Sequence, residues 1–258
     1  MELENLILSL LPAETGLTAG LALVAASYVT SAFTAALGLG GGLMMLAAMA
    51  SLLPPLAVIP VHALVQLGSN SGRAVVMRKD IDWKLLGFFA IGSVVGIGLA
   101  MQVVVALPTE ALRIVLAAFI IWAVWGPKPK KMLIKDAAFI IVGAFGSFVT
   151  MFVGATGPLV AAFLSPDRLG RHGMVANQGS CMTVQHGLKI VAFGILGFAF
   201  VEWIPLVLAM VATGFAGTLT GKAILDRMPE KAFRIGFKAL LTLLSLRLAY
   251  LGVMDLIA

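Results

Sequence analysis

The chain has 258 residues, of which 60% are hydrophobic and only 12% are charged, and its formal net charge is +6. Soluble domains carry about 25% charged residues. This composition, with a mean hydropathy of +1.05, therefore excludes an ordinary soluble enzyme domain and predicts an all-α membrane protein with several spans. The single cysteine, Cys181, excludes an internal disulfide framework. The basic residues lie mainly in short loops, where they indicate membrane orientation and lipid contact. We expect no nucleic-acid partner.

Four hydrophobic segments fill the first half of the chain, over residues 16–53, 56–77, 85–107 and 108–125. No Asp, Glu, Lys or Arg occurs from Thr15 to Gly72, which is enough apolar chain for more than two crossings at about 20 residues each. The first segment is interrupted by the glycine-rich run Gly38–Gly42. The start M-E-L-E-N has no basic region, so we expect no cleaved signal peptide.

The second half repeats this order. A basic run, P-K-P-K-K, lies in a predicted cytoplasmic linker over residues 127–136. An apolar segment over residues 137–164 follows and is broken by G-A-T-G-P at Gly154–Pro158. Then come a polar loop from Ser165, a helix with several polar residues, a segment over residues 203–222 and a last helix from Pro229.

The two halves share features at constant offsets. Gly38 and Gly41 recur as Gly154 and Gly157 at an offset of 116. The Pro, Arg and Ile at positions 108, 113 and 114 recur at 229, 234 and 235, an offset of 121. Chance is the alternative explanation, because Gly and Leu are abundant here. The pattern nevertheless predicts two sequence-related repeats, residues 1–126 and 137–258, as is common in transporters.

The basic loops indicate how the repeats are oriented. The loop after the first polar helix is basic, whereas in the second half the basic loop precedes the corresponding helix. Because cytoplasmic loops are enriched in Lys and Arg, this opposite bias predicts inverted repeats. Each repeat then has a re-entrant or kinked Gly-broken segment plus three transmembrane helices, and both termini face outside. Eight simple spans in parallel repeats remain the alternative.

Two apolar helices, residues 58–78 and 174–194, carry matching polar stripes. The spacing of the first stripe places its members on one helical face. A cation costs about 2.5–3.5 kcal/mol at mid-membrane on insertion scales, so the cation that ends each stripe predicts an anion between them. Snorkelling of both cations to an interface is the alternative. The first stripe is His62, Gln66, Ser69, Asn70 and Arg73, and the second is Gln178, Gln185, His186 and Lys189.

The predicted substrate site combines these stripes with the glycine breaks. Arg73 and Lys189 neutralise the charge of the anion, and the amide, hydroxyl and imidazole groups of the stripes supply hydrogen-bond donors. A broken helix at membrane depth also exposes backbone N–H groups, and close helix packing through small residues is the alternative for these glycines. The residues of the breaks in this site are Gly40, Gly41, Gly42, Gly154, Thr156 and Gly157.

Catalytic and cofactor signatures are missing from the sequence. Asn70 stands where a nucleophile elbow needs serine, and no phosphate-binding G-x-x-x-x-G-K-[ST] loop occurs. The histidines at 62 and 186 lack a neighbouring acidic or cysteine cluster, so we expect no metal. His186 is a candidate proton carrier because imidazole titrates near neutral pH, and a packing role is the alternative. We expect no enzyme activity and no cofactor.

The glycine-broken motifs and the two striped helices together resemble those of the TauE/SafE family of sulfite and sulfonate exporters. The similar stretches are G-L-G-G-G-L, H-A-L-V-Q-L-G-S-N-S-G-R, G-A-T-G-P-L and N-Q-G-S-C-M-T-V-Q-H-G-L-K. The resemblance covers residues 16–251. It implies a multi-pass secondary transporter of small sulfur-containing oxyanions, or related organic anions, in the bacterial inner membrane.

From the residues and the resemblance together we expect an exporter of a small organosulfur anion, such as sulfite, a sulfonate or sulfoacetate, coupled to the proton gradient. An anion channel and an importer of small carboxylates stay open as alternatives. The expected partners are the anionic substrate and membrane lipid, and a homodimer is left open. The sequence fixes neither the substrate nor the direction of transport.

Overall fold

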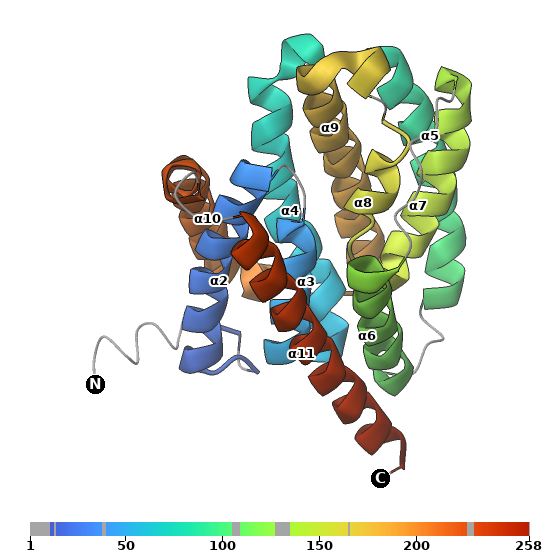
Figure 1. Cartoon of the computed structure of the whole chain (residues 1–258). Helices are drawn as coiled ribbons and strands as arrows, with labels where there is room; N and C mark the ends of the chain where they lie inside the picture. The colour runs from blue at the N-terminus through green and yellow to red at the C-terminus, as the bar shows by residue number, and fades with distance from the viewer. Residues whose placement is uncertain are drawn as a thin grey trace. The chain divides into compact units, whose positions relative to one another are not determined.

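The structure is a computed structural model, and it describes residues 11–12, 14–37, 40–104, 109–126, 135–164, 166–225 and 230–257 (Figure 1). All regular elements in these ranges are helices, as the composition predicts. The α-helices are α2 (Leu17–Leu37), α3 (Gly41–Leu52), α4 (Pro55–Val76), α5 (Trp83–Val104), α6 (Thr109–Trp125), α7 (Phe139–Val153), α8 (Gly157–Ala161), α9 (Pro166–Ile195), α10 (Ile204–Leu225) and α11 (Glu230–Ile257). Short 3₁₀ helices are η1 (Arg78–Asp80), η2 (Asp136–Ala138) and η3 (Phe200–Trp203).

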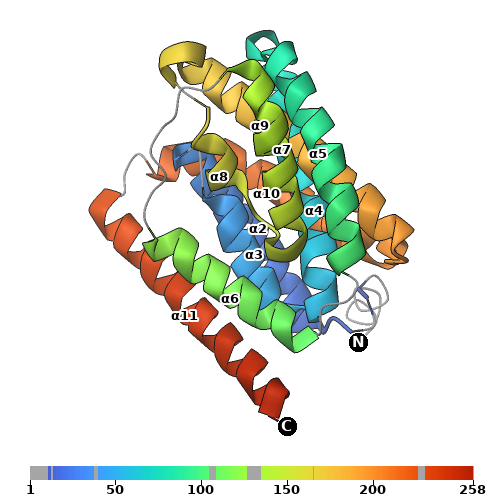
Figure 2. The same ribbon diagram turned by 90° about the vertical axis from the view of Figure 1, so that its right-hand side faces the viewer.

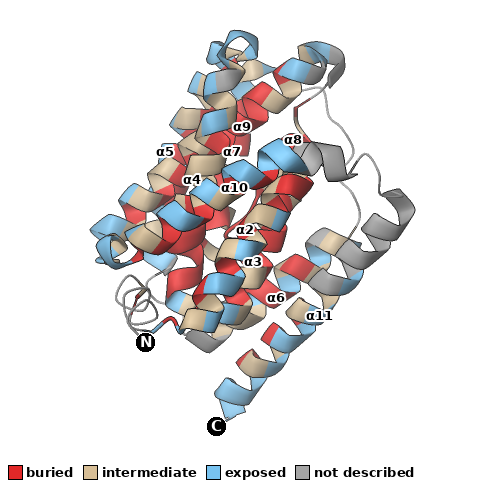
Figure 3. Cartoon of the chain, turned by 90° about the vertical axis from the view of Figure 1, so that its left-hand side faces the viewer, coloured by how far each residue is buried: buried red, intermediate tan, exposed pale blue. Residues whose placement is uncertain are grey.

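Four helical segments among the described residues are long and apolar enough to cross a membrane. They are Leu17–Thr34, Trp83–Val103, Asp136–Val153 and Phe200–Thr220. Large apolar side chains stand exposed along them, for example Phe145 at 59% and Leu219 at 67%. Figure 3 shows exposed residues along the helices in the same way. Such faces suit lipid rather than water, and the protein is a membrane protein.

The contacts divide the chain into two compact units. Unit 1 holds residues 1–65, 108–126 and 199–258, and unit 2 holds residues 66–107 and 127–198. Each unit therefore takes helices from both predicted repeats, and the boundary between the units falls within α4. The repeats are defined by sequence rather than by packing, so the boundaries at residues 126 and 137 stay a prediction.

In unit 1, α2 packs against α10 and α6 packs against α11. Ser27 Oγ donates a hydrogen bond of 2.6 Å to the Met210 carbonyl, which ties α2 to α10. Trp125 Nε1 donates to Thr242 Oγ1 at 2.9 Å, and an ion pair joins Arg113 to Asp255. Since residue 125 meets 242 while 113 meets 255, α6 and α11 run antiparallel.

The first predicted glycine break is a hairpin of α2 and α3 in unit 1. Gly40 has φ 103°, a conformation that favours glycine. A Cβ on Gly41 would lie 2.2 Å from the Thr30 carbonyl oxygen, and Thr30 Oγ1 lies 3.7 Å from Met45 Sδ. These contacts show that α3 folds back along α2. Gly38, the partner of Gly154 in the predicted repeat, lies outside the described residues.

Unit 2 is built on the close packing of α5 against α7, and Figure 2 shows these two helices side by side. A Cβ on Gly96 would lie 2.0 Å from the Ala144 carbonyl oxygen, and one on Gly143 would lie 2.2 Å from the Phe89 carbonyl oxygen. Glycine at these positions lets the two backbones touch. A buried core that includes Leu85, Phe89, Val142, Val160 and Cys181 joins α5 and α7 to α8 and α9.

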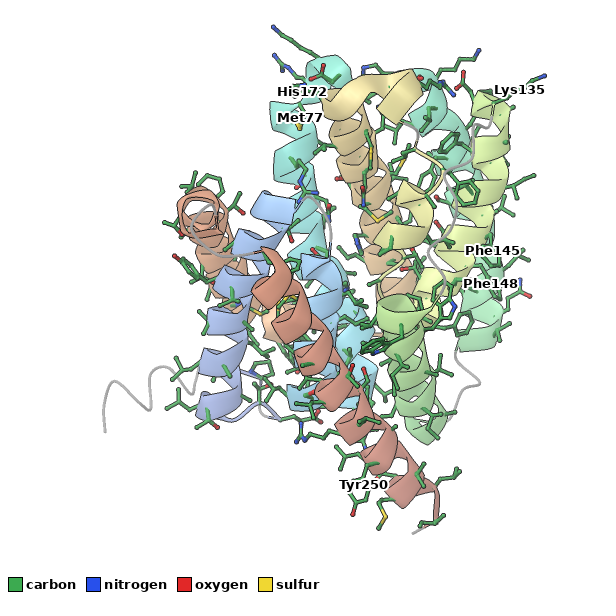
Figure 4. All side chains as sticks on the ribbon, in the orientation of Figure 1. Met77, Lys135, Phe145, Phe148, His172 and Tyr250 are labelled. Atoms are coloured by element: carbon green, nitrogen blue, oxygen red, sulfur yellow. The ribbon has the colours of Figure 1, made fainter. Side chains whose placement is uncertain are left out.

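The second glycine break is a hairpin of α7 and α8. The chain leaves η2, passes down α7, breaks at Gly154 with φ 77°, and returns through α8. Arg168, after the hairpin, donates hydrogen bonds to Asp136, before it, and to Asp82 Oδ2 at 3.0 Å. Figure 4 shows Met77, Lys135 and His172 at this same end of unit 2. The two ends of residues 136–168 therefore lie close together in unit 2.

The second striped helix is longer than the sequence analysis predicts. The sequence predicts a polar loop at residues 165–173, but α9 begins at Pro166. Proline suits a first helical turn because its φ is already fixed and it needs no N–H partner there. Gly170, with φ 68° and ψ 174°, interrupts this first part, so the expected break is present as a kink within α9.

Candidate functional site

The second polar stripe lies on the buried face of α9. The exposed fractions are 7% for Gln178, 0% for Gln185, 3% for His186 and 0% for Lys189. Leaving polar groups buried without partners costs free energy. Three of these side chains bond to the broken segment between α7 and α8, so the stripe and the second glycine break form one polar cluster inside unit 2.

Lys189 is the charged member of this cluster. Its Nζ donates to the Gly154 carbonyl oxygen at 2.8 Å and to Thr150 Oγ1 at 3.4 Å. Gly154 ends α7, where carbonyls lack intrahelical partners and the helix dipole is negative. The ammonium therefore caps α7. Among the described residues no carboxylate lies within ion-pair distance of it.

Gln185 joins α9 to both sides of the break. Its Oε1 accepts a hydrogen bond from Thr156 Oγ1 at 2.8 Å, and its Nε2 donates to Ser147 Oγ at 3.1 Å. All three side chains are at most 1% exposed. About two helical turns before Gln185 on α9, Gln178 Nε2 donates to the Gly157 carbonyl oxygen at 3.4 Å. The tip of the hairpin is thus held by a hydrogen-bonded network.

Side chains of the stripes bond to backbone carbonyls of both breaks. The sequence analysis expects the N–H groups of Gly40–Gly42, Gly154 and Gly157 to bind substrate. In the structure the carbonyls of Gly42, Gly154 and Gly157 accept hydrogen bonds from side chains of the stripes. The contribution of the N–H groups stays a prediction.

The first polar stripe runs along α4. In unit 1, His62 is fully buried and its Nε2 lies at 2.9 Å from the Gly42 carbonyl oxygen. Gln178 makes a similar contact with Gly157: residues 62 and 178 differ by 116, and residues 42 and 157 differ by 115. In unit 2, Asn70 is buried and donates from Nδ2 to the Gln66 carbonyl oxygen at 2.8 Å. Gln66, Ser69 and Arg73 are half-buried.

The two striped helices run antiparallel where they meet in unit 2. A Cβ on Gly187 would lie 3.9 Å from Leu67 Cδ1, and one on Gly179 would lie 3.5 Å from the Asn70 carbonyl oxygen and 3.5 Å from Arg73 Cδ. Further along, Asn177 Nδ2 donates to the Asp80 carbonyl oxygen at 3.2 Å. Increasing residue number on α4 therefore pairs with decreasing residue number on α9.

The structure does not bring Arg73 and Lys189 together. Arg73 lies beside Gly179, ten residues from Lys189 on α9 (189 − 179). At 1.5 Å of rise per residue, this separates the two levels by roughly 15 Å along the helix. The two cations mark two levels of the α4–α9 face rather than one point.

Sequence reasoning missed Ser147 and Thr150, which bond to Gln185 and Lys189 from α7. A signal for them exists. Ser31 and Thr34 stand at the same offset of 116 in the first half, so the pair of hydroxyls recurs with the glycine break. Hydroxyls three residues apart on an apolar helix face one side.

An ionic cluster closes the end of unit 2 where the hairpin starts and finishes. Arg168 bonds to Asp82 and Asp136, and Lys84 Nζ lies 3.8 Å from Asp136 Oδ2. Asp82 Oδ1 also accepts from the Leu85 backbone N–H at 3.0 Å, as an N-terminal helix cap does. These carboxylates serve the helix ends and not the buried cluster.

Comparison with known protein families agrees with this architecture. Residues 23–248, nearly the whole chain, match the family profile described as sulfite exporter TauE/SafE. The chain belongs to the TauE/SafE family. Members of this family are membrane transporters, so transmembrane transport of the sulfite and sulfonate type is the activity that membership implies. No curated protein and no solved structure matches the chain. No group of metal-ligating side chains occurs in the described part of this TauE/SafE protein.

Proposed function

We propose that this TauE/SafE protein is a secondary transporter that exports a small organosulfur anion across the bacterial inner membrane. The substrate class is sulfite, a sulfonate or a sulfoacetate-like anion. Family membership supports the chemical class, and the buried cation Lys189 carries the assignment to this site. The stripe residues of α4 and α9 supply the remaining donors, and Arg73 provides a positive charge at the second level of the α4–α9 face.

The chemistry of Lys189 supports an anionic substrate. Its ammonium is fully buried and donates to one carbonyl and one hydroxyl, neither of which cancels a full charge. A buried charge that is not compensated costs several kcal/mol. A sulfonate or sulfite at this level would supply the missing negative charge together with acceptor oxygens for Gln185, one helical turn away on α9. Charge-assisted hydrogen bonds of this kind are the stronger ones.

The path of the chain supports alternating access through inverted repeats. The hairpin of α7 and α8 returns to its starting side, and α9 runs against α4. Two structurally related halves of opposite direction are the usual basis for a substrate site that opens to either side in turn. Inverted repeats are thus part of the proposal. A channel would need a continuous polar path, and the described polar residues of unit 2 gather at the hairpin tip and the Arg73 level.

The proposal is tested by equilibrium exchange in proteoliposomes. Purified protein is reconstituted with an unlabelled anion inside, and labelled sulfite, taurine, sulfoacetate or a short carboxylate is added outside. We expect uptake of label for at least one organosulfur compound and none in protein-free liposomes. Exchange of carboxylates alone would overturn the substrate class, and exchange of none would overturn the function.

The matched variants are Lys189→Gln and Lys84→Gln. The same change is made inside the buried cluster and at a loop lysine whose side chain is 73% exposed. We expect the Lys189 variant to lose anion affinity by about 1.5–3 kcal/mol, the scale of a hydrogen bond to a charged group, and the Lys84 variant to bind like the parent. Equal affinity in both folded variants would remove Lys189 from the site.

A further inference from the structure

The polar cluster of unit 2 contains basic groups and no acidic group. Residues 55–79, 137–166 and 168–201 contain no Asp or Glu. The acidic residues that flank these ranges are Asp80, Asp82, Asp136, Asp167 and Glu202. The striped helices and the hairpin tip are therefore free of carboxylates as a matter of sequence.

The described carboxylates stand elsewhere. Asp82 and Asp136 pair with Arg168 at the end of unit 2, and Asp255 pairs with Arg113 in unit 1. Asp80 and Glu202 are exposed. Within unit 2, Asp82 and Asp136 are held by Arg168 and do not bond to Lys189.

The groups that face Lys189 can be named for each packed element of unit 2. From α7 and the break they are Thr150 and the Gly154 carbonyl, which do not titrate. On its own helix, His186 is adjacent. Residues 85–104 of α5 contain no titratable side chain. The charged group of α4 in this unit is Arg73, which lies beside Gly179, ten residues before Lys189 on α9. Every one of these titratable groups becomes a cation when it binds a proton.

Because these groups are all bases, proton binding and anion binding in this cluster favour one another. A bound anion raises the proton affinity of neighbouring bases, and by linkage a bound proton raises their affinity for the anion. A proton would therefore be held together with the anion and released with it. Exchange of an outgoing anion for an incoming proton needs a group whose proton affinity rises when the anion departs. A carboxylate that competes with the substrate for the cation would be placed differently from the basic groups found here. Since an inward proton gradient opposes outward movement of a proton with the anion, it cannot drive export through this cluster.

We propose that export by this protein is electrogenic: the anion leaves with its own negative charge, no proton is exchanged for it, and the inside-negative membrane potential supplies the energy. This inference rests on the proposed function. It differs from the expectation of the sequence analysis, export coupled to the proton gradient, which stays an untested prediction. Membrane potential acts directly on the net charge moved per cycle.

The experiment measures steady-state concentration ratios in proteoliposomes for compounds of different charge. A potential is imposed with a potassium gradient and valinomycin at equal pH on both sides. The probes are taurine, a zwitterion without net charge near neutral pH, methanesulfonate, a monoanion, and sulfoacetate, a dianion. Because 59 mV corresponds to a tenfold ratio for one charge, we expect ratios of about 1, 10 and 100 at that potential, with accumulation on the positive side.

The converse arm imposes a gradient of one pH unit at zero potential. We expect ratios near 1 for all three probes, in the parent and in His186→Gln alike. Accumulation of either anion under the pH gradient would overturn the inference, and its loss in His186→Gln would assign proton coupling to that histidine. Equal ratios for the three probes under a potential would also overturn it. Failure of the proposed function is seen separately, as absence of exchange without any gradient.

Discussion

Arg73 and Lys189 occupy equivalent places in the sequence but different surroundings. Lys189 is fully buried and its ammonium is anchored to α7. Arg73 is half-buried and lies against Gly179, where the missing side chain leaves room beside the guanidinium stem. Arginine remains charged at any physiological pH and can hold an oxyanion with two parallel hydrogen bonds. The two cations therefore contribute differently to anion binding.

Two replacements of Arg73 distinguish the contribution of its positive charge from that of its two-pronged hydrogen bonding. We expect Arg73→Gln to weaken substrate binding by about 1.5–3 kcal/mol, and Arg73→Lys to recover only part of this because the two-pronged contact is lost. Folding should survive, since each change removes or keeps an insertion cost without adding one. Substrate titration of the purified proteins measures the effect.

The control is Arg78→Gln, at the exposed start of η1 five residues further on. It should bind like the parent. Parent-like affinity of a folded Arg73→Gln would mean that Arg73 contributes to topology and not to the site.

At this scale the sequence predicted the polar stripes but not their contacts. Spacing alone places Gln185 and Lys189 on one face of a helix. It does not show that they bond to the hairpin tip, because the chain direction there depends on Gly154 at φ 77°. Residues with a side chain rarely adopt such a φ, so the direction of the Gly154 carbonyl cannot be deduced from helical spacing. Thr150 and Ser147 were missed because single hydroxyls on an apolar helix are common and usually bond to their own backbone.

Two helix pairs in different units use the same contacts. A Cβ on Gly96 would lie 2.0 Å from the Ala144 carbonyl oxygen, and one on Gly217 would lie 2.1 Å from the Tyr28 carbonyl oxygen. Residues 96 and 217 differ by 121, and residues 28 and 144 differ by 116, the two offsets of the predicted repeats. The packing of α5 on α7 thus has the same register as that of α10 on α2.

A second contact repeats this register with different chemistry. Gly143 packs so closely against the Phe89 carbonyl that a Cβ on it would lie 2.2 Å from the oxygen. At the equivalent place Ser27 donates to the Met210 carbonyl at 2.6 Å. One interface uses a glycine for close approach and the other uses a short side chain as donor. This match across two separate units supports the proposed duplication independently of the glycine motifs.

The matched glycines predict matched losses of stability. Gly96→Ala and Gly217→Ala should each destabilise the protein by about 1–3 kcal/mol, because the added methyl group meets backbone that cannot move aside. Gly98→Ala is the control on α5, since a Cβ there has no neighbour within 4 Å and alanine favours the helix. Thermal unfolding in detergent measures the difference. Unchanged stability in both Gly96→Ala and Gly217→Ala would contradict the close packing.

Element boundaries were predicted where apolar runs end, and the helices α4, α5 and α10 lie close to the expected ranges. The kinked start of α9 was not predicted. Its residues 165–173 are polar with two glycines, a composition typical of loops. Contacts such as Asn177 with the Asp82 N–H at 2.9 Å fix this region in place, and tertiary contacts of this kind cannot be read from local composition.

At the scale of the whole molecule, the direction of each helix decides the topology. In the proposed topology the hairpin of α7 and α8 makes no net crossing, and α9, α10 and α11 are the crossings of the second repeat. An odd number reverses the direction of the chain relative to the first repeat, in agreement with α9 running against α4. The sequence left this choice open because hydropathy does not distinguish a hairpin from a span of similar length. The contact of Arg168 with Asp136 is what separates them.

The last prediction is therefore that both termini face the periplasm and that the linker faces the cytoplasm. Ala258 and the linker residue Lys130 lie outside the described residues, so reporter fusions at these two positions test the topology directly. Fusions at Lys79 in η1 and at Gly197 after α9 serve as internal references for the cytoplasmic and periplasmic sides. With three crossings after the linker, Ala258 must report the periplasm when Lys130 reports the cytoplasm. A cytoplasmic signal at both positions would require an even number of crossings in the second half, and it would contradict the inverted arrangement and with it the proposed route of alternating access.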